Sequence, residues 1–157
     1  MLEENYNLID KRIKCNEYAP DVFAHLRELD GFTIDDLRES LDPCLNKNIK
    51  NIFKAGEGMG KSGSFFFFSH DDRFLIKTMT SDDFKSFMSI FITYFYHINE
   101  DNSSLLARVY GVFQITLEDM KPCYLMLMGN TKNVPSDNIY KMFDLKGSIT
   151  KRFVKRD

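Results

Sequence analysis

Apolar side chains recur at helical spacing in two parts of the chain. In residues 20–31 they step mostly by three or four positions, and a glycine closes the segment. Residues 82–98 repeat this spacing with a longer apolar set: Phe84, Phe87, Met88, Phe91, Phe95 and Ile98. Between the two, Thr33 followed by Asp36 has the spacing of a capping box and predicts a shorter helix over 33–41. The pattern therefore predicts three helices, of which the last has a face that belongs in a core.

Short apolar and aromatic segments bounded by turn residues predict β-strands. Residues 65–78 contain two such segments around the turn sequence SHDDR, which predicts a hairpin. Residues 105–117 and 123–128 predict two more strands, 140–145 a last short one, and the polar, glycine-rich residues 46–64 a loop. This order of elements predicts an α+β fold, a twisted antiparallel sheet of about five or more strands with N-terminal helices and one long packed helix.

Length and composition agree with one globular domain. The chain has 157 residues, of which 43% are hydrophobic and 28% charged, so disordered, collagen-like and coiled-coil classes are excluded. The net charge of −2 argues against an unselective nucleic-acid binder. The charge is uneven, because residues 1–45 carry eleven acidic and five basic side chains, whereas residues 141–157 carry six basic and two acidic ones. A basic tail of this kind suits contact with an anionic membrane surface.

Cysteine usage and the N-terminus indicate the compartment. Cys15, Cys44 and Cys123 are too few and too scattered for a disulfide framework or a tetrahedral zinc site, which favours a reducing environment. The first residues lack the basic and apolar regions of a secretory signal. The longest apolar tract, residues 84–98, is interrupted by polar side chains and is shorter than the roughly 20 residues of a membrane span. We therefore expect a soluble, cytoplasmic protein.

The glycine-rich sequence GEGMGKSGS fits two phosphate-binding patterns that predict different structures. A Walker A loop needs a glycine where this chain has Ala55, and it needs a helix where a strand is predicted. The kinase-type pattern G-x-G-x-x-G is satisfied by Gly58, Gly60 and Gly63, at the tip of a hairpin that covers nucleotide phosphates. A glycine-rich surface turn without a ligand is the third interpretation.

Lys77 favours the kinase-type interpretation. It ends the sequence FLIK, which resembles the V-A-I-K strand whose lysine reaches the nucleotide phosphates. A charged side chain in an apolar strand is costly unless an anion neutralises it. The alternative is an edge-strand lysine that serves solubility alone. Glycine loop and lysine together predict nucleotide binding.

Four motifs in order resemble the phosphatidylinositol phosphate kinase family. GKSGSFFFFSHDDRFLIKT, residues 60–78, resembles the signature loop and strand pair of that family, and MFDLKGSITKR, residues 142–152, resembles its D-L-K-G-S segment. Residues 17–41 resemble the helical segment before the loop. LLARVYG, residues 105–111, resembles the family's L-L-P-x-F-Y-G sequence, with Ala107 where proline is usual.

The resemblance implies an enzyme that uses ATP and Mg²⁺ to phosphorylate a phosphatidylinositol phosphate, giving the bisphosphate. It implies a kinase-like N-terminal lobe over residues 17–157, preceded by an extension of residues 1–16. The metal ligands are then expected in a C-terminal lobe beyond Asp157, and residues 1–157 are expected to be inactive alone. The implied partners are a phosphoinositide lipid, an anionic membrane surface reached peripherally from the cytoplasm, and a second copy in a homodimer.

The same resemblance assigns site residues. The implied ATP-binding residues are Gly60, Lys61, Ser62, Gly63 and Ser64 in the loop, Lys77 on the strand, Met128, Gly129 and Asn130 at the adenine hinge, and Lys146 near the transferred phosphate. Lys77 and Lys146 are the implied catalytic cations, because the transferring phosphoryl group carries negative charge that positioned cations stabilise. Arg152 is the implied contact for the lipid headgroup, and no metal ligand is assigned.

The chain also departs from the family pattern in the predicted helix after Lys77. The family pairs its strand lysine with a glutamate about eight or nine residues later, where this chain has Lys85 and Ser86. Asp82 and Asp83 are the nearest acidic residues. An aspartate therefore substitutes, or the ion pair is absent. The second case leaves a non-catalytic lipid-binding or scaffold protein as the alternative function.

Overall fold

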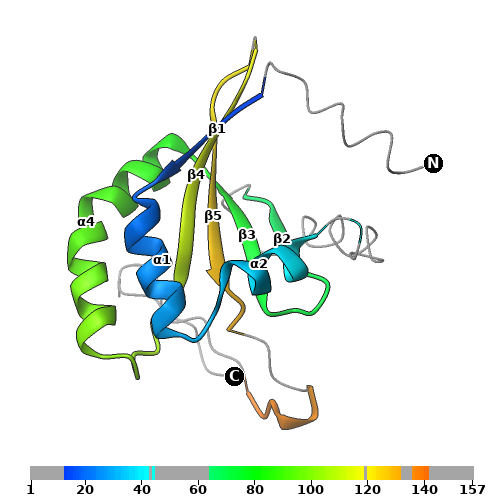
Figure 1. Cartoon of the computed structure of the whole chain (residues 1–157), viewed down its shortest axis with the longest axis vertical. Helices are drawn as coiled ribbons and strands as arrows, with labels where there is room; N and C mark the ends of the chain where they lie inside the picture. Colours follow the sequence, from blue (N-terminus) through cyan, green and yellow to red (C-terminus); the bar gives the residue numbers. More distant parts are fainter. Residues whose placement is uncertain (1–12, 43, 45–63, 119, 132–135, 142–157) are drawn as a thin grey trace, which may run out of the picture.

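The structure, a computed structural model, describes residues 13–42, 44, 64–118, 120–131 and 136–141 (Figure 1). Along the chain these form strand β1 (Ile13–Tyr18), helices α1 (Pro20–Leu29) and α2 (Ile34–Leu41), strands β2 (Phe66–Phe68) and β3 (Phe74–Met79), helix α4 (Ser81–Glu100), strands β4 (Val109–Leu117) and β5 (Cys123–Gly129), and the short 3-10 helix η2 (Ser136–Asn138). The predicted α+β fold is confirmed.

The strands form one five-stranded antiparallel sheet in the order β1-β4-β5-β3-β2. The predicted hairpin is present, with β2 paired to β3. Strand β5 lies in the middle, between β4 and β3, so segments far apart in sequence become neighbours in the sheet. The two edges are β1 and β2 in the part of the chain that the structure describes.

Helices cover both faces of this sheet. Helices α1 and α4 pack side by side on one face (Figure 1) and bury a core that contains Phe23, Leu26, Phe91, Tyr94, Ile98, Val112 and Met126. Helix α2 lies against the other face, where Leu37 packs with Phe74, Tyr110 and Leu127. The apolar stripe predicted for residues 82–98 is thus core, as its spacing indicated.

Local sequence explains where the helices begin and end. Thr33 and Asp36 form the predicted capping box at the start of α2, and Thr80 and Asp83 form a second one at the start of α4. Gly31 follows α1 with a φ of 77°, a left-handed conformation that glycine adopts without strain. The Gly31 and Phe32 amides donate to the carbonyls of Glu28 and Arg27, which turns the chain sharply toward α2.

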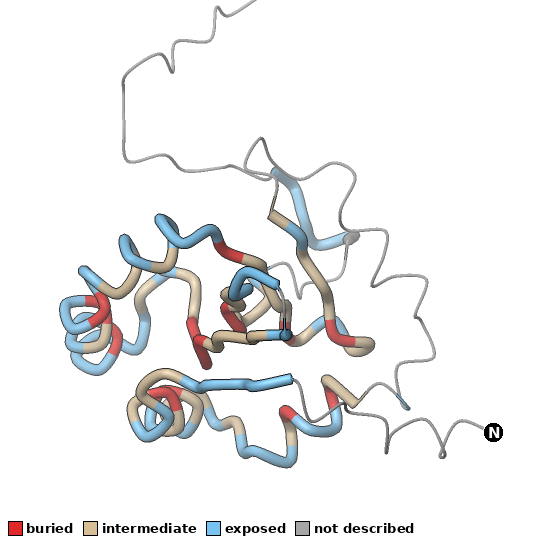
Figure 2. Tube along the Cα trace, turned by 90° about the horizontal axis from the view of Figure 1, so that it is seen from above, coloured by how far each residue is buried: buried red, intermediate tan, exposed pale blue. Residues whose placement is uncertain are grey.

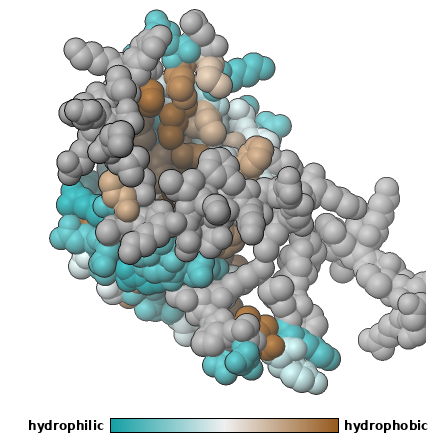
Figure 3. Space-filling view, turned by 90° about the vertical axis from the view of Figure 1, so that its right-hand side faces the viewer, coloured by the Kyte–Doolittle hydropathy of each residue, from teal (hydrophilic) through white to brown (hydrophobic). Residues whose placement is uncertain are grey.

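Buried residues lie mainly between the helices and the sheet, as Figure 2 shows in red. Strand β1 is exposed except for Tyr18, which is half-buried. Seen from the side of β2 and α2, apolar atoms gather in the upper part of the molecule above a hydrophilic band (Figure 3). At the end of the sheet where β1 begins, the paired residues Ile13 and Leu117 remain 41% and 37% exposed.

The sequence analysis missed strand β1. Its sequence, IKCNEY, has few apolar residues because the strand lies at the sheet edge and is exposed on both faces. The strand is defined by its backbone pairing with β4, which runs from Ile13 opposite Leu117 to Tyr18 opposite Val112. Its side chains have no periodicity that would predict it. The strand spans the boundary expected between residues 16 and 17, so the sheet begins four residues earlier than the expected lobe.

Two other predicted strand boundaries differ. Residues 105–108 precede β4 instead of belonging to it, and Leu105 is 99% exposed. The Tyr94 hydroxyl marks the boundary, because it donates to the Ala107 carbonyl (3.0 Å) and accepts from the Val109 amide (2.8 Å). Tyr140 and Lys141 are not in a strand, and residues 142–145 lie outside the described residues.

A charged network around Asp71 fastens the β2–β3 turn to α2. The Asp71 carboxylate accepts hydrogen bonds from Ser40 Oγ (2.6 Å), Ser69 Oγ (2.6 Å) and Arg73 Nε (2.7 Å). Arg73 also donates to Ser40 Oγ (2.8 Å) and pairs with Asp36 at 3.5 Å. Burial raises the pKa of Asp71, but these hydrogen bonds outweigh it and hold the pKa well below its ordinary value of 3.8.

This network predicts a pH-dependent loss of stability in an Asp71→Asn variant. At pH 7 the substitution should lower the free energy of unfolding by about 1–3 kcal/mol, because buried donors lose a charged acceptor. The pKa of Asp71 is depressed in the folded state, so its contribution is present above pH 3.8 and is lost as the pH falls. Urea unfolding at pH 7 and pH 3 should therefore show a smaller difference from the wild type at the lower pH.

Asp35→Asn is the matched control. The Asp35 side chain is 83% exposed and, in the described part of the chain, pairs with the exposed Arg38, so its loss should change stability by less than about 0.5 kcal/mol at either pH. Equal effects of the two substitutions would contradict the role given to Asp71.

Candidate nucleotide-binding site

Lys77 lies in β3 with a paired strand on each side. It is opposite Phe66 of β2 and opposite Met126 of β5, so the backbone that carries it is held in both directions. Its ammonium nitrogen lies 5.8 Å from the centre of the Phe66 ring. Lys77 is half-buried and makes no ion pair with any residue that the structure describes. Its charge is thus available to an anion.

The end of the glycine loop lies beside this lysine. The Phe65 amide donates to Thr78 Oγ1 (2.8 Å), and the Thr78 amide donates to the Phe65 carbonyl (2.9 Å). Phe65, which directly follows Ser64, is therefore bonded to Thr78, the residue after Lys77. Residues 60–63, which hold the other predicted loop residues, lie outside the described residues.

The structure excludes the Walker A interpretation. That motif requires the residues after the lysine and serine to open a helix that caps the phosphates. Here the residues after the loop form strand β2, antiparallel to β3. The hairpin arrangement of the kinase-type loop is the one that the described strands fit.

The predicted hinge residues Met128 and Gly129 lie on different faces of the sheet. Side chains alternate between faces along a strand, so residues opposite each other on neighbouring strands share a face. Met128 is opposite Leu75 and therefore shares the face of Lys77. Gly129 is opposite Phe74 and lies on the other face. Of the predicted hinge, only Met128 presents its side chain on the lysine face.

The end of β5 is held by hydrogen bonds from two directions. The Gly129 amide donates to the Arg108 carbonyl (3.0 Å), just before β4. The Asn130 amide donates to the Arg73 carbonyl (2.9 Å), and Asn130 Nδ2 donates to the Asp72 carbonyl (2.7 Å), both in the β2–β3 turn. Because Arg73 belongs to the Asp71 network, α2 is connected to the predicted hinge.

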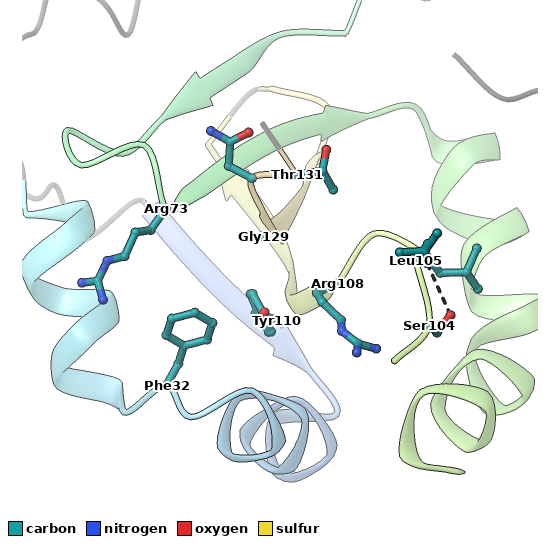
Figure 4. Close-up of a pocket in the computed structure, with 10 residues that line it drawn as sticks. Phe32, Arg73, Ser104, Leu105, Arg108, Tyr110, Gly129 and Thr131 are labelled. Carbon is teal, nitrogen blue, oxygen red and sulfur yellow. Dashed lines mark hydrogen bonds between the residues drawn. The ribbon is translucent and has the colours of Figure 1, made fainter. Parts of the chain in front are cut away.

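A pocket of about 430 Å³ adjoins the predicted hinge on the face opposite Lys77. It is lined by Phe32, Arg73, Arg108, Tyr110, Gly129 and Thr131, among others. Figure 4 shows Gly129 above Tyr110 and Arg108, with Arg73 on the side of α2. Neither Lys77 nor Met128 lines it, so this pocket is separate from the lysine face.

Tyr110 and Arg108 converge on Asp30 at the end of α1. The Tyr110 hydroxyl donates to Asp30 Oδ2 (2.8 Å), and Arg108 Nε lies 3.3 Å from the same oxygen. Burial and the Asp30 carboxylate raise the pKa of the Tyr110 phenol far above its ordinary value, so the phenol stays protonated. The sequence analysis assigned no role to these three residues, because their contacts join positions 80 residues apart.

No carboxylate of α4 takes the place of the family glutamate beside Lys77. Lys85 and Ser86 are exposed, and Asp82, whose side chain is 95% exposed, lies 3.9 Å from Lys85. Asp83 does interact with the charge of Lys77. The hydrogen bonds from Thr80 lower the pKa of Asp83, and the charge of Lys77 lowers it further. However, the capping box already uses the Asp83 carboxylate.

The remaining predicted site residues, Lys146 and Arg152, lie outside the described residues. Among the residues that the structure does describe, no group of three His, Cys, Asp or Glu side chains is arranged to hold a metal ion. In the same part of the chain, no helix has the length and apolarity needed to cross a membrane.

Comparison with known proteins decides the family. The sequence profile of the family described as Phosphatidylinositol-4-phosphate 5-Kinase matches residues 47–157, more than half of the chain. The chain belongs to this family. The matched residues include the glycine loop, the strand of Lys77, the end of β5 and the D-L-K-G-S segment.

Individual relatives of the chain carry names of the same kinase family. The chain is 37% identical over 139 residues to a probable phosphatidylinositol phosphate kinase of Dictyostelium discoideum, covering 88% of this chain and 19% of that protein. It is 35% identical over 139 residues to phosphatidylinositol 4-phosphate 5-kinase its3 of Schizosaccharomyces pombe, covering 88% and 18%. Phosphatidylinositol 4-phosphate 5-kinase 7 of Arabidopsis thaliana is 32% identical over 140 residues, with 89% and 18% covered. The chain thus spans slightly less than a fifth of the length of these relatives.

The capping role of Asp83 can be tested against its neighbour. Asp83→Ala should lower the free energy of unfolding by about 1 kcal/mol, because α4 loses half of its capping box. Asp82→Ala is the matched control, since it has the same charge and lies in the same helical turn but has no part in the box. Its effect, measured by urea unfolding, should be below about 0.5 kcal/mol. Equal losses would contradict the assignment.

Proposed function

We propose that this chain forms the nucleotide-covering lobe of a phosphatidylinositol phosphate kinase, which transfers the γ-phosphoryl group of ATP to a phosphatidylinositol phosphate. The proposed lobe comprises residues 17–157, and strand β1 extends its sheet back to Ile13. The expected extension, residues 1–16, then contributes its last four residues to the sheet. Membership in the kinase family supports this proposal.

The observation that carries the proposal is the position of Lys77. Its ammonium group shares a sheet face with Met128, and its strand lies beside the end of the glycine loop. A phosphoryl group in transfer spreads negative charge over its oxygens, and a cation held in place stabilises that charge. Without an ion-pair partner in the described part of the chain, Lys77 is suited to contact the phosphates of ATP.

The other site residues are proposed from the family motifs. Backbone groups of residues 128–130 would hydrogen-bond the adenine edge, and residues 60–64 would cover the phosphates. Lys146 would be a second cation at the transferred phosphoryl group, and Arg152 would contact the lipid headgroup. The described residues offer no set of metal ligands, so no step is assigned to Mg²⁺.

The basic residues 141–157 support a peripheral membrane location. They carry six basic and two acidic side chains. Each basic residue close to an anionic leaflet gains about 1 kcal/mol. We therefore propose that this end of the lobe faces the phosphoinositide-containing surface, on the cytoplasmic side. A homodimer is the proposed oligomeric form.

One observation favours a second function. No carboxylate of α4 forms an ion pair with Lys77 among the described residues, and Asp83 is engaged by Thr80. Active kinases hold the strand lysine with a helix glutamate. A relative that binds lipid or serves as a scaffold without transferring phosphate would not need that pair.

Lys77→Ala distinguishes the two functions. In the complete protein the substitution should raise the Kd for ATP about tenfold or more, because the phosphates lose a charge-assisted contact. Titration with a fluorescent ATP analogue measures this Kd. Lys121→Ala removes an exposed lysine from the β4–β5 turn and should leave it unchanged. Unchanged ATP affinity in Lys77→Ala would favour the scaffold function.

We also predict that a polypeptide of residues 1–157 transfers no phosphate by itself. It spans less than a fifth of the length of its relatives and, as proposed, covers the nucleotide from one side only. Incorporation of radiolabelled phosphate into vesicles of phosphatidylinositol 4-phosphate or 5-phosphate measures the transfer, with the complete protein as the positive control. Robust turnover by residues 1–157 would contradict this prediction.

A further inference from the structure

We propose that Tyr110 is a positioning residue for the nucleotide, which sets the place of the hinge from the sheet face opposite Lys77. This inference rests on the proposed function of residues 128–130 as the hinge that binds adenine. Tyr110 would act through the backbone of Gly129 and would not touch the nucleotide itself.

Tyr110 lies against Gly129 at the end of β5. A Cβ atom added at Gly129 would lie 3.2 Å from Tyr110 Cε2 and 3.5 Å from the Tyr110 hydroxyl. The first distance is shorter than an ordinary van der Waals contact, so the aromatic ring lies directly against the hinge backbone. Only glycine lets strand and ring approach this closely without displacement.

Tyr110 is itself held rigidly. It is 3% exposed, and its ring packs edge-on against Phe32 and Phe74 with centroid distances of 5.5 and 5.8 Å. Its hydroxyl donates to Asp30 Oδ2 at 2.8 Å. Its carbonyl accepts from Arg27 Nη1 at 2.7 Å. Four residues outside β4, which come from α1 with its C-cap, the α1–α2 turn and β3, therefore fix where the ring meets Gly129.

The sheet is irregular at Tyr110. The pairing of β4 with β5 shifts register between Val109 and Gly111. Such a bulge re-aims a side chain and leaves one residue out of the ladder, and bulges are common beside functional sites. Arg27 Nη1 donates a hydrogen bond to the Tyr110 carbonyl at this position. The bulge thus directs Tyr110 toward the end of β5.

Arg108 forms an ion pair with Asp30, the residue that also binds the Tyr110 hydroxyl. Both side chains are largely buried, with 15% and 14% exposed, and Arg108 Nη1 has no hydrogen-bond partner in the described part of the chain. A buried pair with an unsatisfied donor contributes little net stability. It does fix positions: the Arg108 carbonyl accepts from the Gly129 amide, and Asp30 accepts from Tyr110. The end of α1 is therefore connected to Gly129 in two ways, through Arg108 and through Tyr110.

These contacts predict a specific kinetic change. Displacement of Gly129 would move the adenine contacts relative to Lys77, which is held separately by β2 and β5. Loss of the Tyr110 restraint should therefore weaken ATP binding and leave lipid binding and kcat unchanged. A residue that is merely structural would instead reduce the active fraction, which lowers kcat at constant KM.

The experiment compares variants of the complete kinase. Tyr110→Phe removes only the hydroxyl that binds Asp30 and should raise the KM for ATP about threefold to tenfold. Gly129→Ala inserts a methyl group against the ring and should raise it about tenfold or more. Tyr96→Phe is the matched control, because Tyr96 is 57% exposed on α4, and it should change neither KM nor kcat.

A double variant tests the contact itself. Tyr110→Leu removes the Cε2 atom that the added methyl group would meet, so Gly129→Ala should have a much smaller effect on the KM for ATP in that background. Additive effects of the two substitutions would overturn the proposed contact. An unchanged KM for ATP in Tyr110→Phe and Gly129→Ala, with or without a lower kcat, would overturn the positioning role.

Lys77→Ala in the same ATP titration separates this inference from the function on which it rests. If Lys77→Ala weakens ATP binding and the Tyr110 and Gly129 variants do not, the positioning role alone fails. If Lys77→Ala also leaves ATP affinity unchanged, the proposed nucleotide site fails as a whole. Thermal unfolding of each variant establishes that it is folded, and Tyr110→Phe keeps the ring packing even if Gly129→Ala unfolds the lobe.

Discussion

Strand β3 is paired along its length with β5 and on its other side with β2, and this double backbone pairing determines where Lys77 lies. Because side chains alternate along a strand, the same pairing assigns Lys77 and Met128 to one face and Phe74 and Gly129 to the other. The lysine needs no partner side chain to define its direction. A charge placed in this way can meet an anionic ligand without first breaking an ion pair.

The two faces of the sheet carry different sets of residues. The face covered by α1 and α4 carries Lys77 and most of the apolar core. The other face carries a polar and aromatic network from α2 through Asp71 and Arg73 to Asn130, and from Asp30 through Tyr110 to Gly129. The end of β5 is therefore restrained from the side that the proposed nucleotide does not occupy.

The sequence analysis identified elements with a clear periodicity and missed those without one. The stripe of α4 and the Thr33–Asp36 capping box were confirmed, because both depend on residues within a few positions of each other. Strand β1 was missed because an exposed edge strand has no apolar alternation. The prediction that Leu105 and Leu106 belong to a strand was wrong, because β4 begins only at Val109, whose amide donates to the Tyr94 hydroxyl.

For the candidate site, the sequence by itself determined the residue types and the family: the glycine loop, Lys77 in an apolar strand, and a chain that matches the kinase profile. It also showed that Lys85 and Ser86 stand where a glutamate is usual. Only the tertiary structure decided which residues support the end of β5. Asp30, Arg108 and Tyr110 meet through contacts that span about half of the chain, and such contacts follow from strand order and a bulge, which local sequence does not encode.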